Sequence, residues 1–150
     1  MTFLPTDVGT GAAAMQKILG LGGVFFRARD PQALGAWYET HFGIDSMASG
    51  NVWAQQAGPT VFAPFRDDTD YFGRDQQSFM VNFRVADLEA MVEQLRAAGV
   101  ACDGDILDEE GVGRFFRVHD PEGNPIELWQ PAELAEPAGE PEGSDTQLPN

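Results

Sequence analysis

Glu127 is the residue of this sequence best suited to acid–base chemistry, because it lies between Ile126 and Leu128 in a largely apolar stretch. Apolar surroundings disfavour the ionised form of a carboxylate, and a carboxyl group tuned in this way suits a general acid or base. A structural role is equally compatible, with the carboxylate paired to Arg27 or Arg84. The residues alone leave both interpretations open.

Asn82 and the two arginines alternate with apolar residues in two related segments, Val24–Pro31 and Val81–Leu88, which lie 57 residues apart. In a strand such alternation separates two faces. The apolar faces, which are expected to pack under helices, carry Val24, Phe26 and Ala28 in one copy and Val81, Phe83 and Val85 in the other. The opposite faces carry Gly23, Phe25 and Arg27, and Met80, Asn82 and Arg84. A buried charge needs a partner. The arginines therefore either lie at a solvated or acid-paired rim, or approach an anionic or carbonyl group of a ligand.

Each related segment runs from a predicted strand into a predicted helix. Asp30 and Asp87 are good N-caps, and Gly43 and Gly99 are expected to end the helices that follow. The expected strands are 22–28, 44–47, 52–56 and 60–65 in the first copy and 79–85, 103–107, 114–119 and 126–130 in the second. The sequence therefore predicts an α+β fold of two βαβββ modules, which form a cupped, roughly eight-stranded mixed sheet with the helices outside.

The predicted domain covers residues 18–131, with module one at about 18–65, module two at about 79–131 and a linker between them. Residues 1–17 lack clear periodicity and are expected to be a flexible extension. Residues 132–150 are rich in Pro, Gly and Glu with almost nothing to bury, so a disordered acidic tail is expected.

The formal net charge of −15 argues against nucleic acid or an anionic membrane surface as a partner, because both need basic patches. Cys102 is the only cysteine, which excludes an internal disulfide and a cysteine-based zinc cluster. The sequence has no apolar run long enough for a transmembrane helix and no secretory signal. A cytoplasmic protein is therefore expected.

Two motifs, together with the repeat, resemble the vicinal oxygen chelate superfamily, which includes glyoxalase I, extradiol dioxygenases and bleomycin-resistance proteins. They are the aromatic helix end at 37–43 and the Asp-Pro-Glu-Gly-Asn-Pro-Ile-Glu-Leu sequence at 120–128. The segment from Asp70 to Gly73 is similar to that of a bacterial glyoxalase-like subgroup. The resemblance implies homodimerisation and a divalent metal held by one residue from each of four strands.

The four metal positions implied by the resemblance are Gly23, Val61, Met80 and Glu127. Only Glu127 could ligate a divalent metal, because Gly and Val offer no donor and Met offers a soft thioether. His41 and His119 are expected to be surface or packing residues. No cofactor is therefore expected, and a divalent metal is the disfavoured alternative.

The remaining cup residues point to a small-molecule site. Phe25, Trp53, Phe62 and Trp129 could form aromatic walls for a planar ligand, and Asn82 can orient a ligand through its donor and acceptor groups. Tyr71, in the linker, is a candidate lid. The expected ligand-binding residues are Phe25, Arg27, Trp53, Phe62, Met80, Asn82, Arg84 and Trp129.

The preferred functional hypothesis is a protein like the bleomycin-resistance branch, which binds a small planar or anionic molecule in the cup without the usual metal centre. One alternative is a metal-dependent lyase, isomerase or dioxygenase with an atypical ligand set. Another is a metal-free enzyme that uses Glu127 as its catalytic residue. The fold alone does not choose among these, because one scaffold hosts many chemistries.

Overall fold

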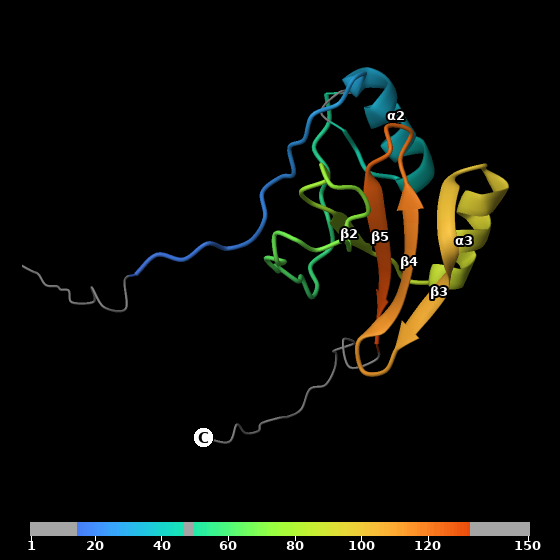
Figure 1. Cartoon of the computed structure of the whole chain (residues 1–150). Coiled ribbons are helices and arrows are strands. Elements are labelled where there is room, and N and C mark those ends of the chain that lie inside the picture. The colour runs from blue at the N-terminus through green and yellow to red at the C-terminus, as the bar shows by residue number, and fades with distance from the viewer. Residues whose placement is uncertain (1–14, 47–49, 133–150) are drawn as a thin grey trace, which may run out of the picture.

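The computed structural model describes residues 15–46 and 50–132, so the predicted N-terminal extension and acidic tail lie almost wholly outside it. Within these ranges the elements are α2 (Pro31–Phe42), β2 (Val81–Arg84), α3 (Leu88–Ala97), β3 (Ala101–Glu109), β4 (Gly113–His119) and β5 (Pro125–Pro131). The strands form one mixed sheet in the order β2-β5-β4-β3, in which only the β2–β5 pair is parallel. The helices lie to one side of the sheet, and the green segment between α2 and β2 loops past the other side (Figure 1). No described helix has the length and apolar character to cross a membrane.

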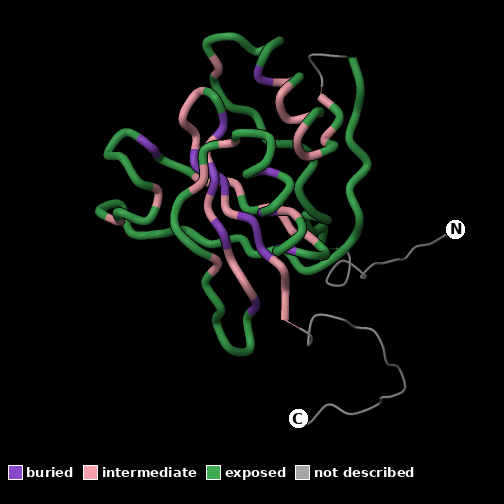
Figure 2. Tube along the Cα trace, turned by 90° about the vertical axis from the view of Figure 1, so that its right-hand side faces the viewer, coloured by how far each residue is buried: buried purple, intermediate pink, exposed green. Residues whose placement is uncertain are grey.

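The core lies between α3 and one face of the sheet. Alternation along the central strands sends Phe116 and Val118 of β4, with Ile126 and Leu128 of β5, toward the helix side. These side chains form one buried cluster with Leu88, Val92 and Leu95 of α3. Figure 2 shows the buried residues gathered mainly along the sheet, whereas most of the described N-terminal half is exposed. The helix-facing residues Phe83 and Val85, expected from alternation, also pack against this cluster.

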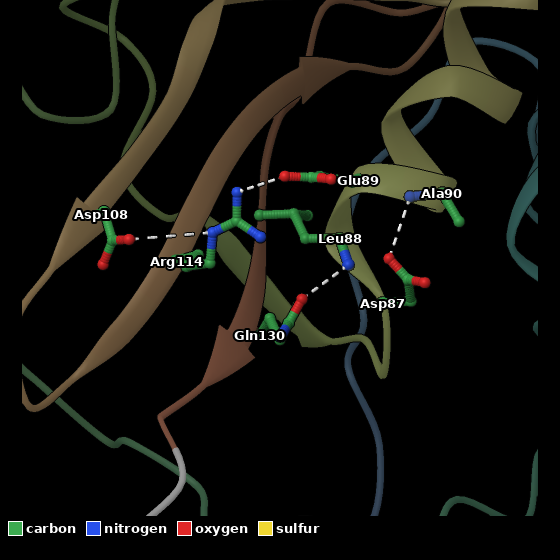
Figure 3. Close-up of polar contacts among 7 residues, drawn as sticks. All are labelled: Asp87, Leu88, Glu89, Ala90, Asp108, Arg114 and Gln130. Carbon is green, nitrogen blue, oxygen red and sulfur yellow. Dashed lines mark hydrogen bonds and ion pairs between the residues drawn. The ribbon is translucent and has the colours of Figure 1, made fainter.

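The N-terminus of α3 is held by two side chains (Figure 3). The Asp87 carboxylate accepts a hydrogen bond from the backbone N–H of Ala90 at 3.1 Å, as the capping prediction requires. Gln130 of β5 accepts from the backbone N–H of Leu88 at 2.8 Å. Two otherwise unsatisfied helix donors are thereby paired, and one of them joins α3 to the sheet.

The predicted boundaries of α2 are confirmed. The Asp30 side chain accepts from the backbone N–H of Ala33 at 3.1 Å, and Pro31 occupies the first turn. Gly43 ends the helix at φ 69°, a left-handed conformation that glycine adopts without steric cost.

Asp120, in the turn between β4 and β5, joins α2 to the rest of the structure. Its side chain is only 4% exposed. One carboxylate oxygen accepts from the Tyr38 hydroxyl of α2 at 2.8 Å and from the Asn124 amide at 2.8 Å. The other oxygen accepts from the backbone N–H groups of Glu122 at 2.9 Å and Asn124 at 3.0 Å. The buried carboxylate is therefore satisfied by donors from both the turn and the helix.

The second predicted module forms, but the first does not form its expected sheet. No residue in 22–28, 52–56 or 60–65 is in a strand, nor is the described part of 44–47. The eight-stranded cup is therefore replaced by one four-stranded sheet. The physical reason is that a strand is stabilised by its neighbours, and in the part of the chain that the structure describes these segments have no paired neighbour strand. Several of their apolar side chains stay in solvent, with Phe25 94% and Phe62 83% exposed.

We expect Asp120→Ala to lower the free energy of unfolding by about 2–4 kcal/mol, because it leaves several buried donors without an acceptor. Chemical denaturation followed by tryptophan fluorescence measures this change. Asp108→Ala is the matched control: it removes the same charge from an exposed, weakly paired side chain and should cost no more than about 0.5 kcal/mol. Equal losses in the two variants would contradict the anchoring role of Asp120.

Candidate functional site

Glu127 lies at the centre of the sheet face that points away from the helices. The register places it beside Asn82 of β2 and Arg117 of β4. The Asn82 amide donates a hydrogen bond to Glu127 Oε1 at 2.8 Å. Since paired residues share a face, these three polar side chains form one cluster, which we call the Glu127 cluster.

Tyr71 completes the Glu127 cluster from the linker. Its hydroxyl donates a short hydrogen bond to Glu127 Oε2, and the Arg117 guanidinium lies 4.8 Å from its ring centroid. The Phe65 ring stacks on the Tyr71 ring, with the two ring centroids 5.5 Å apart. Burial, followed by the hydrogen bond and negative charge of Glu127, raises the pKa of Tyr71 to about 12, while Arg117 acts in the opposite direction.

Aromatic side chains continue the same face toward the end of β5. Trp129 and Phe115, paired across β5 and β4, stack with ring centroids 6.1 Å apart and planes 3° apart. The Trp129 indole N–H donates to the Val112 carbonyl at 3.0 Å. Trp129 is therefore a buried side chain with a fixed orientation, and its role as an aromatic wall for a ligand stays a prediction.

Arg84 also emerges on this face, next to Trp129 in the register. Its guanidinium donates to the Gln56 carbonyl at 2.8 Å and lies so close to Gly58 that a Cβ there would be 2.2 Å from Nη1. Of the two interpretations left open for Glu127, pairing with Arg84 or Arg27 is not observed, because Glu127 is paired with Tyr71 and Asn82. Arg84 holds the segment at 56–58 against the sheet instead.

Several predicted ligand residues lie apart from the Glu127 cluster. Phe25 and Phe62 are largely in solvent, and Trp53 packs edge-on against Phe83 with centroids 6.1 Å apart. Arg27 lines a separate hollow near the β4–β5 turn. Met80 is half-buried just before β2. The structure therefore gathers Asn82, Glu127 and Trp129 of the second module on one sheet face and disperses the residues of the first module.

The sequence interpretation missed Arg117 and Phe115. A signal for both was present, because the turn at 120–124 sets the β4–β5 pairing and so places Arg117 opposite Glu127. The contact of Tyr71 with Glu127 spans 56 residues and joins a loop to a strand. No local pattern encodes that contact.

The donor set at the four implied metal positions does not fit a divalent ion. Gly23 and Val61 have no donor, and Val61 is 71% exposed. Both oxygens of Glu127 already accept hydrogen bonds. Across residues 15–46 and 50–132, no three His, Cys, Asp or Glu side chains gather as metal ligands. His119 contacts Asp103 at 2.7 Å, and His41 packs on Trp37.

Comparison with known proteins identifies the scaffold. A family model described as "Glyoxalase-like domain" matches residues 23–129, well over half of the chain. No curated protein matches the sequence. A solved structure described as a conserved domain protein is 10% identical over 75% of this chain and 99% of its own, with a TM-score of 0.51. That likeness is one of fold.

Two further solved structures are similar to the chain. Lactoylglutathione lyase from Agrobacterium tumefaciens is 14% identical over 79% of this chain and 98% of its own, with a TM-score of 0.49. TnmS3, an antibiotic binding protein from Streptomyces sp. CB03234, is 35% identical over 37% of this chain, with a TM-score of 0.33. The matched region spans 46% of the TnmS3 chain, less than half of its length.

The position of Tyr71 can be tested by its ionisation. The sequence has two tyrosines, so Tyr38→Phe leaves Tyr71 as the only source of tyrosinate absorbance. We expect a midpoint at about pH 12 in this background, reflecting the raised pKa of Tyr71. Adding Glu127→Gln should lower the midpoint, and adding Arg117→Gln should raise it, because the two charges act in opposite directions. A midpoint that neither substitution moves would contradict the contact with Glu127.

Proposed function

Because the chain belongs to the glyoxalase-like domain family of the vicinal oxygen chelate superfamily, we propose that it binds a small planar or anionic molecule at the Glu127 cluster, without the usual metal centre. The observation that carries this proposal is the Glu127 carboxylate. It occupies one of the four implied metal positions, but it is hydrogen-bonded to Tyr71 and Asn82. The cluster is polar, fixed in orientation and bordered by aromatic rings. Small-molecule sites likewise combine a few fixed polar groups with aromatic side chains.

The side chains around Glu127 suit a flat ligand with an anionic or carbonyl group. Arg117 and Arg84 bring two guanidinium groups to the same sheet face. Phe65 and Tyr71 present partly exposed stacked rings beside them. A ligand that stacks on these rings would bring its anionic or carbonyl group toward the arginines.

Binding is favoured over proton transfer by Glu127 for a geometric reason. Each of its oxygens already accepts a hydrogen bond from a neighbouring side chain. A general base needs a free acceptor site within hydrogen-bond reach of the substrate proton, and these two bonds leave Glu127 fewer such sites. In the observed arrangement Glu127 positions Tyr71 and Asn82, and those two side chains are better placed to meet a ligand.

We expect a thermal-shift screen of flat aromatic carboxylates and aromatic antibiotics to find a compound that raises the unfolding midpoint. Arg117→Gln should weaken that compound's affinity about tenfold or more, because a hydrogen bond to a charged group is lost. Tryptophan fluorescence gives the dissociation constant, since Trp129 lies on the same sheet face.

Arg66→Gln is the matched control for this screen, because Arg66 is exposed and pairs only locally with Asp68. It removes the same charge and should leave the affinity unchanged. A separate test is metal analysis of protein purified without a histidine tag. Near-stoichiometric nickel, zinc, iron or manganese would contradict the metal-free site and favour a metal-dependent enzyme.

We propose further that two copies complete the eight-stranded cup. Support comes from the apolar side chains that the first half leaves in solvent: Ile18, Leu19, Leu21, Val24, Phe25, Val52, Val61 and Phe62. A large exposed apolar surface is typical of an interface. A second copy would supply paired neighbours for segments that have none within one chain.

The dimer proposal predicts that light scattering on the full chain gives twice the monomer mass. Phe62→Asp should shift the protein toward monomer, because it places a charge among apolar side chains that a partner would cover. Leu107→Asp makes the same change on edge strand β3, at another exposed apolar residue, and should leave the mass unchanged. A wild-type monomer at micromolar concentration would refute the proposal.

A further inference from the structure

An open hollow of about 300 Å³ lies beside the β4–β5 turn and shares no residue with the Glu127 cluster. Three arginines from two separate segments line it. The hollow is bounded by Arg27, Ala28, Arg29, Arg74, Glu122 and Asn124. Arg27 and Arg29 precede α2, whereas Arg74 belongs to the linker before β2.

The charge of this hollow is opposite to that of the protein. The chain has nine basic residues and a formal net charge of −15. Three of the nine basic residues are nevertheless gathered here around a single carboxylate. The ion pairs among the described residues involve other cations, and none joins Arg27, Arg29 or Arg74 to a described Asp or Glu.

The single carboxylate, Glu122, is already engaged by the backbone. Its oxygens accept from the N–H of Arg29 at 2.7 Å and the N–H of Asp30 at 2.9 Å. These two hydrogen bonds hold the pKa of Glu122 below its usual value. Glu122 therefore fixes the chain at the entry to α2 and forms no direct ion pair with any of the three guanidinium groups.

Arg74 is held in place by a buried side chain. Its guanidinium donates to Gln77 Oε1 at 3.0 Å. Gln77 is itself buried and donates to the Phe79 carbonyl at 2.9 Å. A guanidinium fixed in this way loses less conformational entropy when it binds an anion.

We propose that this hollow binds a small oxyanion, either a phosphate or a carboxylate group, through the guanidinium groups of Arg27, Arg29 and Arg74. Guanidinium groups match the geometry of both anions through paired N–H donors. The three guanidinium groups outnumber the single Glu122 carboxylate of the hollow, so they repel one another, and a bound oxyanion offsets that repulsion. The anion would also bridge the segment before α2 and the linker that carries Tyr71.

The test is a titration of the full-length protein with inorganic phosphate and, separately, with acetate at constant ionic strength, followed by amide NMR. We expect saturable shifts confined to residues 27–30, 73–77 and 122–124. Shifts with phosphate alone identify a phosphate site, and stronger shifts with acetate identify a carboxylate site. Absence of saturable shifts with both anions would overturn the proposal.

Variants make the test specific. Arg74→Gln and Arg27→Gln should each weaken the preferred anion about tenfold or more. Arg66→Gln removes the same charge from an exposed position outside the hollow and should leave the affinity unchanged. Equal weakening by Arg66→Gln would show a general charge effect and overturn the site. Arg74→Lys should retain part of the affinity, since it keeps the charge but loses the paired donors.

Discussion

A buried carboxylate with four hydrogen-bond donors constrains the structure more than any other interaction. The Asp120 carboxylate accepts from the Tyr38 hydroxyl of α2 as well as from donors of its own turn. Displacement of α2 would therefore leave this buried carboxylate with one donor fewer or expose it to solvent. The same turn sets the pairing of β4 with β5 and thereby places Arg117 opposite Glu127. A slip of one residue would send Glu127 to the apolar face under α3. The geometry of the site therefore depends on a turn that contributes nothing to its chemistry.

The parts of the fold that the sequence predicts are those governed by local rules. Helix caps at Asp30 and Asp87 depend on residues three positions away, and both helices begin where capping requires. The second-module strands follow from alternation and from the turn between them. The strands expected at 22–28 and 60–65 carry equally good strand patterns and do not form. A strand needs a partner, and no local pattern states whether that partner lies in the same chain.

The residues of the candidate site also differ in whether local rules place them. Asn82 and Glu127 could be placed on one face by counting alternate residues, and the structure brings them together. Their third neighbour, Tyr71, comes from a loop distant in sequence and was expected only as a lid. Arg27 and Arg84 occupy equivalent places in the sequence repeat. They would occupy equivalent places in the structure only if both modules formed their first strand. Here only Arg84 has a strand to occupy.

The proposed anion site places three arginines of a strongly acidic protein in one hollow. Charges separated by more than about 8 Å are largely screened at physiological ionic strength. Distant acidic residues therefore have little effect on an anion in the hollow lined by Arg27, Arg29 and Arg74, where the nearest charges decide the interaction. The same argument applies to Arg84 and Arg117 on the sheet face. Net charge governs which large partners approach, whereas local clustering governs which small groups bind. The acidity that argues against a nucleic-acid partner therefore does not argue against a phosphate or carboxylate.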